Sequence, residues 1–110
     1  AEIESAGGAA HMVRLDVTDY ASIKSALAHA ETEAGPIDIL VNNSGVSTTQ
    51  RLVDVTPEDY QFVMDTNLRG SFFVAQEAAK RMIWRSKGDA NREHRSINIA
   101  SVAGRCVLHE

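Results

Sequence analysis

The stretch "ILVNNSG" at residues 39–45 decides the fold class of this chain. It begins as a short apolar run that follows Gly35 and Pro36, and this combination predicts a buried strand over residues 37–41. The run then ends in two amides, a hydroxyl and a glycine. Such a polar tail either closes a turn or faces a group that needs hydrogen bonds. The elements on either side decide between these two interpretations.

The elements before this stretch predict a strand and then a helix. Residues 11–17 alternate apolar and polar side chains, which is typical of a strand. Residues 18–34 predict an amphipathic helix with Thr18 or Asp19 as its N-cap. Its apolar positions recur at helical spacing: Ile23, Ala26, Leu27 and Ala30.

The elements after it repeat the alternation. Thr56 and Pro57, followed by two acids, predict the start of a helix that runs to about residue 84. Gly70 is expected to divide this run into two helices or to kink it. Residues 85–96 are polar and predict a solvated loop, and "INIAS" at 97–101 predicts a third strand.

The order strand–helix–strand–helix–strand predicts the alternating α/β class: part of a doubly wound parallel sheet with flanking helices and right-handed crossovers. In such a sheet all carboxyl ends of the strands lie at one edge, where ligands of open α/β folds bind. Asp16, the polar run at 42–45 and Ser101 each follow one predicted strand. The tail of "ILVNNSG" is therefore expected to face a crevice.

Composition excludes several classes of protein. The 110 residues are 44% hydrophobic and 24% charged, which is ordinary for one globular domain. A net charge of −4 gives no nucleic-acid footprint, and no apolar run reaches the roughly 20 residues of a membrane span. The single Cys106 excludes an internal disulfide and suits the cytoplasm. No metal-ligand spacing joins the four histidines, which are His11, His29, His94 and His109.

Both ends of the chain look like interior sequence. It begins at Ala1 with what resembles the last turn of a helix, leaving through Gly7 and Gly8. It stops at Glu110, soon after a predicted strand and without a closing helix. We interpret residues 1–110 as the central part of a single domain, truncated on both sides.

Four motifs give the chain a family resemblance. They are "LDVTD" at 15–19, "NNSG" at 42–45, Asn67-Leu68-x-Gly70, and "INIASVAG" at 97–104. In this order and spacing they resemble the middle of a short-chain dehydrogenase/reductase, most closely the 3-oxoacyl-acyl-carrier-protein reductases and related sugar or secondary-alcohol dehydrogenases. The resemblance implies a Rossmann fold, NAD or NADP as cofactor, and hydride transfer between the nicotinamide and a carbonyl or secondary alcohol.

The resemblance assigns cofactor-binding residues. Asp16 would hold the adenine amino group and the Val17 backbone amide would meet the ring; the alternative is that Asp16 only caps the next helix. The motif at 42–45 would tie neighbouring strands and pass beside the adenosine ribose, or would be a purely structural clasp. Gly45 would allow close backbone approach or a positive φ. The members of this motif are Asn42, Asn43, Ser44, which replaces the usual Ala, and Gly45.

The resemblance also assigns catalytic residues. Asn67 aligns with a helix asparagine that accompanies a main-chain distortion and a proton-relay water; an unpaired buried amide would otherwise cost about 1–3 kcal/mol. Ser101 aligns with the serine that orients the substrate oxygen. An ordinary helix-breaking Asn and a strand-ending Ser are the alternatives.

Three family elements are expected outside the sequence: the Gly-rich phosphate turn before Ala1, the residue that separates NAD from NADP, and a Tyr-x-x-x-Lys pair after Glu110. The 110 residues alone are therefore predicted to be inactive. The alternatives are a non-catalytic dinucleotide-binding sensor or scaffold and an unrelated flavodoxin-like domain.

The long helix at 57–85 is apolar on more than one face, through Phe62, Phe73, Val74 and Trp84. In the family this helix forms subunit interfaces, so a homodimer or homotetramer is expected. The other expected partner is a small carbonyl or alcohol substrate.

Overall fold

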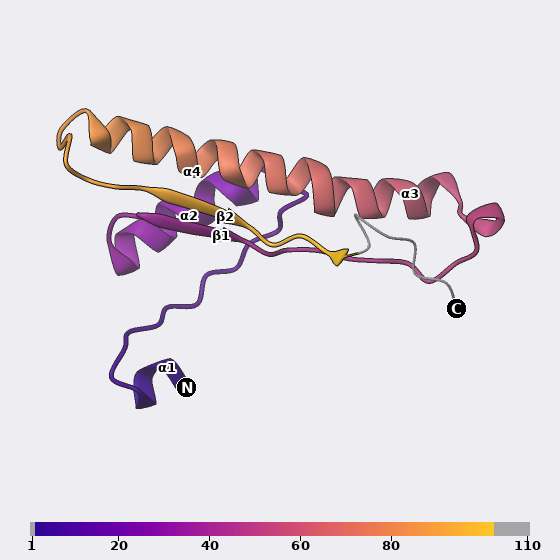
Figure 1. Cartoon of the computed structure of the whole chain (residues 1–110), viewed down its shortest axis with the longest axis horizontal. Helices are drawn as coiled ribbons and strands as arrows, with labels where there is room; N and C mark the ends of the chain where they lie inside the picture. Colours follow the sequence, from indigo (N-terminus) through magenta and orange to yellow (C-terminus); the bar gives the residue numbers. More distant parts are fainter. Residues whose placement is uncertain (1, 103–110) are drawn as a thin grey trace.

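A computed structural model describes residues 2–102 of the chain. Figure 1 shows one long helix running above a two-stranded sheet, with α2 packed beside it and the short α1 set apart at the end of an extended segment. No helix within the described part of the chain is long and apolar enough to cross a membrane. The elements in order are α1 (Glu2–Ser5), α2 (Tyr20–Ala34), β1 (Ile39–Asn42), η1 (Leu52–Asp54), α3 (Pro57–Met64), η2 (Asp65–Gly70), α4 (Ser71–Ser86) and β2 (Arg95–Asn98).

Strands β1 and β2 pair in parallel, which confirms the predicted direction for two of the three strands. The register places Val41 opposite Ile97 and Asn42 opposite Asn98. Both strands are displaced from their predicted bounds, since β1 ends at Asn42 and β2 begins at Arg95 and ends at Asn98. Their carboxyl ends lie side by side, as a parallel pair requires.

The strand predicted at residues 11–17 is wrong. This segment is extended, but it forms no ladder with any described strand, and Met12 is fully exposed. Alternation of side chains shows only that a segment can be pleated, whereas a strand also needs a neighbouring backbone to accept its hydrogen bonds. In the strand order 3-2-1-4-5-6 of doubly wound sheets, the third strand is not adjacent to the fourth. The segment is therefore left without a partner here.

The helix caps follow the sequence closely. The Asp19 side chain accepts from the Ala21 amide at 2.9 Å, so Asp19 rather than Thr18 is the N-cap of α2. Gly35 ends α2 with a φ of 87°. At α3, Thr56 and Asp59 form a reciprocal capping box with Pro57 in the first turn. These local signals are confirmed because each depends on residues only a few positions apart.

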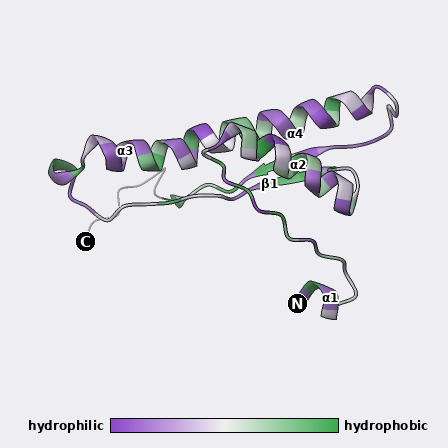
Figure 2. Cartoon of the chain, turned by 180° about the vertical axis from the view of Figure 1, so that it is seen from behind, coloured by the Kyte–Doolittle hydropathy of each residue, from purple (hydrophilic) through white to green (hydrophobic). Residues whose placement is uncertain are grey.

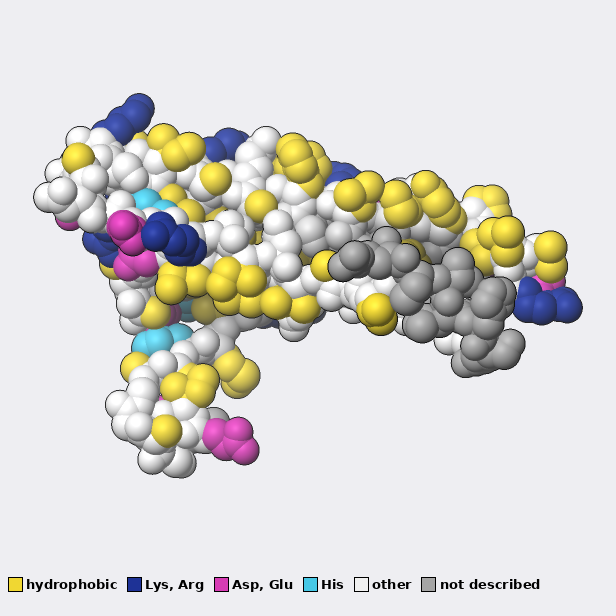
Figure 3. Space-filling model, in the orientation of Figure 1, with side chains coloured by type: hydrophobic (Ala, Val, Ile, Leu, Met, Phe, Trp, Pro, Cys, Tyr) yellow, Lys and Arg dark blue, Asp and Glu magenta, His cyan; other side chains and the backbone are white. Residues whose placement is uncertain are grey.

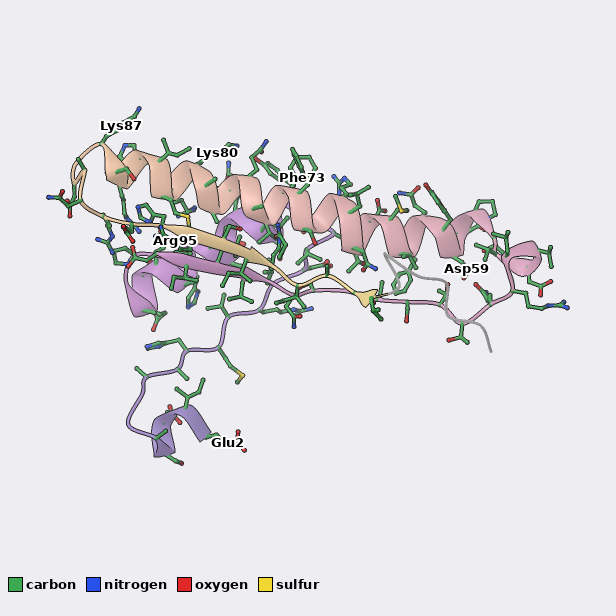
Figure 4. The ribbon with its side chains drawn as sticks, viewed as in Figure 1. Glu2, Asp59, Phe73, Lys80, Lys87 and Arg95 are labelled. Carbon is green, nitrogen blue, oxygen red and sulfur yellow. The ribbon has the colours of Figure 1, made fainter. Side chains whose placement is uncertain are left out.

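Gly70 neither divides the long helix into two helices nor kinks it, so that prediction is wrong. Residues 57–86 make one continuous helix, in which η2 is a π-helical turn between two α-helical halves. Gly70 keeps right-handed helical dihedrals, with φ −60° and ψ −50°. In Figure 4, Asp59 and Lys87 mark the two ends of this helix, and Phe73 and Lys80 lie between them. The widened turn takes the place of a kink.

The hydrophobic core lies between α2, α4 and one face of the sheet. Ile23 and Ala78 are each only 1% exposed at its centre. Figure 2 shows hydrophobic residues where these elements meet, whereas α3 is more mixed. The buried cluster is Val17, Ile23, Leu27, Val74, Ala78 and Met82, with Ile37, Leu40 and Phe73 packed against it.

An ion cluster joins α2 to α4 beside this core. Glu31 lies 2.7 Å from Arg81 and 2.8 Å from Arg85, and Arg81 also reaches Glu77 at 3.3 Å. The side chains of these four residues are between 8% and 22% exposed. The prediction that the charges of residues 85–96 face solvent is therefore wrong for Arg85. The pattern did not reveal its partner because Glu31 lies on another helix.

The same prediction is also wrong for Arg92. Arg92 donates to both carboxylate oxygens of Asp38, at 2.6 and 2.9 Å, and His94 lies 3.6 Å from the same carboxylate. The Arg92 hydrogen bond holds the pKa of Asp38 below its ordinary value. The charged segment therefore fastens the start of β2 to the start of β1.

The other face of the sheet is open and apolar. Ile39, Val41, Ile97 and Ile99 are each about half exposed or more, and Figure 3 shows a band of hydrophobic side chains over the strands. The Cα radius of gyration is 17.0 Å, against roughly 13 Å for a compact domain of this length. The residues described here thus form one layer pair of an α/β sandwich rather than a closed globule.

Candidate functional site

The polar tail of "ILVNNSG" emerges from the sheet edge next to the long helix. Asn42, at the end of β1, is 7% exposed, and its Nδ2 donates to the Ser71 carbonyl at 2.8 Å. Asn43, Ser44 and Gly45 are exposed beyond it. Gly45 does not have a positive φ, so that expectation is wrong, and close approach remains its only special property. Asn42 thus ties strand to helix, while the next three residues face outward.

Asn67 fastens the π-turn to this loop. Its Nδ2 donates to the Val46 carbonyl at 2.7 Å, and its Oδ1 accepts from the Val46 amide at 2.8 Å. Both ends of the side-chain amide are therefore paired with one backbone residue, which removes the cost of an unsatisfied amide. The expected main-chain distortion at Asn67 is confirmed, because η2 spans it. Leu68 beside it is 62% exposed, so the predicted apolar stripe is not buried there.

Asp16 lies in the turn that leads into α2. Its Oδ1 accepts from the Thr18 amide at 2.9 Å and from the Thr18 hydroxyl at 2.7 Å. These two bonds, of which the one from the Thr18 hydroxyl has the larger effect, hold the pKa of Asp16 below its ordinary value. The carboxylate is therefore ionised at neutral pH. Among the described residues no hydrogen bond reaches Oδ2, which leaves that oxygen available to an amine donor. The N-cap of α2 is Asp19, so Asp16 does not cap this helix, and its described side-chain bonds are the local ones to Thr18.

A hollow of about 470 Å³ lies between the two strand ends and the helix. Asn42 and Asn67 line it together with Asn98, Ile99 and Ala100, the residues that leave β2. Ser101 follows directly, three residues beyond the end of β2, and is exposed. The structure thus brings the first amide motif, the helix asparagine and the approach to Ser101 together. A volume of this size is within the range of small-ligand sites.

The turn at Asp16 joins this arrangement from the other side of the helix. Val17 packs on Gly70, and the Thr18 carbonyl accepts from Arg69 Nη1 at 3.0 Å. The turn therefore reaches η2 even though residues 11–17 pair with no described strand. The described residues end before the last part of the fourth motif, which is Ala103 and Gly104, and before Cys106 and His109.

Two other features do not belong to this site. A hollow of about 430 Å³ lies near Pro36, Trp84 and Arg92, at the far end of α4 and away from every predicted site residue. Tyr20 and Lys24 have the spacing of the family's Tyr-x-x-x-Lys, but they lie on α2, where the Lys24 ammonium stands 5.9 Å from the centre of the Tyr20 ring. They also precede Ser101, whereas the family's pair follows its serine. Over residues 2–102, no group of three or more His, Cys, Asp or Glu is placed to hold a metal ion.

Sequence reasoning missed Val46, Ser71 and Arg69 as parts of the site. Val46 and Ser71 act through backbone atoms, so their side chains carry no signal. Arg69 could have been noticed as a cation one residue before Gly70 in the helix motif. Its partner, a backbone carbonyl 51 residues away, could not.

Known proteins resemble this chain along most of its length. A family model described as short chain dehydrogenase matches residues 1–109. Galactitol 2-dehydrogenase of Agrobacterium fabrum is 40% identical over 99 residues, 90% of this chain and 37% of that protein. The 3-oxoacyl-acyl-carrier-protein reductase MabA of Mycobacterium tuberculosis is 37% identical over 92 residues, 84% of this chain and 35% of the relative.

One solved structure extends the comparison to three dimensions. A gluconate 5-dehydrogenase from Burkholderia cenocepacia, in complex with NADP and tartrate, matches with a TM-score of 0.83 at 34% identity, over 97% of this chain and 40% of that one. The predicted alternating α/β fold is therefore confirmed. The chain spans well under half the length of each of these relatives.

Proposed function

This chain belongs to the short-chain dehydrogenase/reductase family, and from that premise we propose that it is the central part of one NAD(P)-binding Rossmann domain in an oxidoreductase. The enzyme would transfer hydride between the nicotinamide of NAD or NADP and a carbonyl or secondary-alcohol substrate. The resemblance to 3-oxoacyl-acyl-carrier-protein reductases is confirmed at the level of the family. The observation that carries the proposal is the π-turn η2, which holds Asn67 against the loop after β1 and beside the end of β2.

The described residues would fit the cofactor along the strand ends. Asp16 offers an ionised carboxylate with one open oxygen, which suits the exocyclic amine of adenine, next to the Val17 amide. Asn43, Ser44 and Gly45 offer exposed polar and backbone groups along the loop after β1, where the ribose would pass. Asn42 supports that loop through its bond to Ser71. The cofactor would supply the hydride, and the protein its position.

Two residues would serve the reacting end. Ser101 would donate a hydrogen bond to the substrate oxygen and orient it for hydride transfer. The Asn67 side chain is occupied by Val46, so its contribution to a proton relay would come through the backbone of η2, whose π-helical spacing alters the regular hydrogen-bond ladder. The Tyr-x-x-x-Lys pair that acts as acid and base would follow Glu110.

The rest of the domain would complete the sheet. Further strands and helices would cover the segment at 11–17, which pairs with no described strand, and the open face over Ile39, Val41 and Ile97. Residues 1–110 alone should therefore show no turnover. We place the protein in the cytoplasm.

The proposal is tested with the complete gene product. NAD(P)H oxidation is assayed against ketoses, simple ketones and a 3-oxoacyl thioester, with Ser101→Ala as the inactive variant and residues 1–110 alone as a second sample. Turnover by the full protein that falls at least 100-fold in Ser101→Ala supports the proposal. Turnover by the 110-residue piece contradicts it. Cofactor binding without turnover on any substrate favours the non-catalytic sensor or scaffold.

The long helix would form a homodimer or homotetramer interface. Phe72, Ile83 and Trp84 are between 61% and 75% exposed on α4. Phe73 is unsuitable for testing this, because it packs on the core and edge-on against Tyr20 at 5.4 Å. Trp84→Lys should reduce the molecular mass seen by light scattering, whereas Leu52→Lys, which is 90% exposed off this helix, should not. An unchanged mass in Trp84→Lys would count against this interface.

A further inference from the structure

Gly70 stands closer to a distant backbone segment than any side chain would permit. A Cβ built on Gly70 would lie 2.8 Å from Val17 Cγ2, 2.9 Å from the Val17 carbonyl oxygen and 3.0 Å from Val17 Cβ. Gly70 has ordinary helical dihedrals, so backbone freedom does not explain its presence. Its role is therefore to admit the turn at Val17 against the helix.

Two further contacts fasten the same pair of segments. Arg69 Nη1 donates to the Thr18 carbonyl at 3.0 Å, and its guanidinium lies 5.3 Å from the centre of the Phe73 ring. Tyr20 packs edge-on against the same ring at 5.4 Å. Residues 17–20 thus touch residues 69–73 at three successive points. No described strand pairs with residues 8–16, so the turn is held by these contacts together with the packing of α2 on α4.

The same helical turn also holds the opposite loop. Asn67, three residues before Gly70, clasps Val46 after β1. The π-turn η2 therefore fixes the separation between the Asp16 turn and the loop after β1. Any retreat of the Asp16 turn from Gly70 would change that separation.

We propose that Gly70, assisted by Arg69, is a positioning residue that sets the distance between the Asp16–Val17 turn and the long helix. It thereby aligns this turn with the adenine end of the dinucleotide. This inference rests on the proposed function, in which that turn receives adenine. Gly70 touches no cofactor itself and acts through Val17. Its effect should accordingly be confined to the adenine half of the ligand.

The size of the effect follows from the distances. Carbon–carbon contacts are most favourable at about 3.5–4.0 Å, so Gly70→Ala would push the turn back by roughly 0.5 Å or more. A misplacement of about 1 Å can cost on the order of 100-fold in a positioned site. We therefore expect about tenfold weaker binding at the adenine end. Loss of the Arg69 bond should weaken binding about two- to tenfold, the range of one hydrogen bond.

The test uses the complete gene product and calorimetric Kd values for NAD(P)H and two part-ligands. ADP-ribose keeps the adenosine, the diphosphate and the second ribose but lacks the nicotinamide ring, whereas reduced nicotinamide mononucleotide lacks the adenosine. Gly70→Ala should raise the Kd for ADP-ribose about tenfold and leave that for the mononucleotide within twofold. Arg69→Met, an exposed substitution, should shift the same ligand in the same direction. Gly70→Ala combined with Val17→Ala, which removes the nearest atom, should recover part of the loss.

The matched control is Gly88→Ala, whose Cβ would meet only the Arg85 carbonyl at 3.5 Å and which should bind all three ligands normally. Equal losses for both part-ligands, or none, in Gly70→Ala would overturn the inference while leaving the proposed function intact. If Gly70→Ala does not fold, Arg69→Met decides by the same two outcomes. A wild-type protein that binds neither NAD(P)H nor ADP-ribose overturns the proposed function and this inference with it.

Discussion

Replacing Glu31 with Gln should be among the most destabilising isosteric changes in the chain. Glu31 accepts a hydrogen bond from Arg81 at 2.7 Å and forms an ion pair with Arg85 at 2.8 Å, and its side chain is 13% exposed. The attraction is of order 4 kcal/mol per pair at an effective dielectric constant of about 20. Most of it is offset by the cost of removing the charges from water.

The net effect comes from what remains after the substitution. Glu31→Gln keeps the shape but leaves Arg85 without a carboxylate among its described ion pairs and Arg81 with only Glu77 at 3.3 Å. Breaking a fully buried pair in this way costs about 3–5 kcal/mol. Because both arginines keep about a fifth of their side-chain surface in water, we expect about 2–3 kcal/mol here.

The assay is urea unfolding of the complete gene product, followed by a signal that reports this domain. Glu33→Gln is the control on the same helix, since Glu33 is 52% exposed and its described ion pair is the one with His29 at 3.7 Å. This change should alter stability by less than about 0.5 kcal/mol. Adding Arg85→Gln to Glu31→Gln should cost less than the sum of the two single changes. A Glu31→Gln protein as stable as Glu33→Gln would refute the reasoning.

Three further substitutions test the bonds between Asn67 and Val46, the glycine that ends α2, and the ion pair between Arg92 and Asp38. Asn67→Asp keeps the acceptor for the Val46 amide but sets a carboxylate oxygen against the Val46 carbonyl. It should therefore lower the unfolding free energy by about 1–2 kcal/mol in urea titrations. An unchanged free energy would mean that the pair of bonds between Asn67 and Val46 contributes nothing to stability. Gly35→Ala forces a φ of 87° with a ψ of −174° on a residue with a side chain, so it should lower the free energy of unfolding by about 1–3 kcal/mol. Gly88→Ala should be nearly neutral. Equal melting temperatures for the two variants would contradict this. The Arg92 hydrogen bond lowers the pKa of folded Asp38 from 3.8, so its stabilisation is present above about pH 4 and is lost as the pH falls through the lowered pKa. Melting temperatures measured from pH 7 down to pH 2 should therefore fall less steeply for Asp38→Asn than for wild type, and identical slopes would exclude Asp38 as a source of acid sensitivity.

The local features that the sequence predicted correctly depend on near neighbours. Asp19 and the Thr56–Asp59 box could be placed because a cap and its amide are two or three residues apart. The parallel pairing of β1 and β2 also followed, since a long helix between two strands leaves little other topology.

The features that failed depend on distant partners. Residues 11–17 have the pattern of a strand, but a strand also needs a second backbone, and alternation says nothing about its presence. Gly70 has the pattern of a helix breaker, but in the structure it lies against Val17, 53 positions earlier in the chain, where a Cβ would clash. For the site, the amide and acid side chains could be chosen in advance. Their supports, the Val46 backbone and the Ser71 carbonyl, could not.

The π-helical turn makes the length of this helix as important as its composition. An α-helix advances about 100° and 1.5 Å per residue, and a π-turn absorbs one residue beyond that regular count. Deleting a single residue between 65 and 70 would restore a regular helix and leave α3 and α4 close to their present orientation, but it would remove the widened turn that sets Asn67 against Val46. The loop that Asn67 holds would then leave the strand ends, although every other side chain was retained. Residues in this turn can be exchanged one at a time during evolution, but the turn cannot be shortened without losing the loop after β1 from its place beside the strand ends.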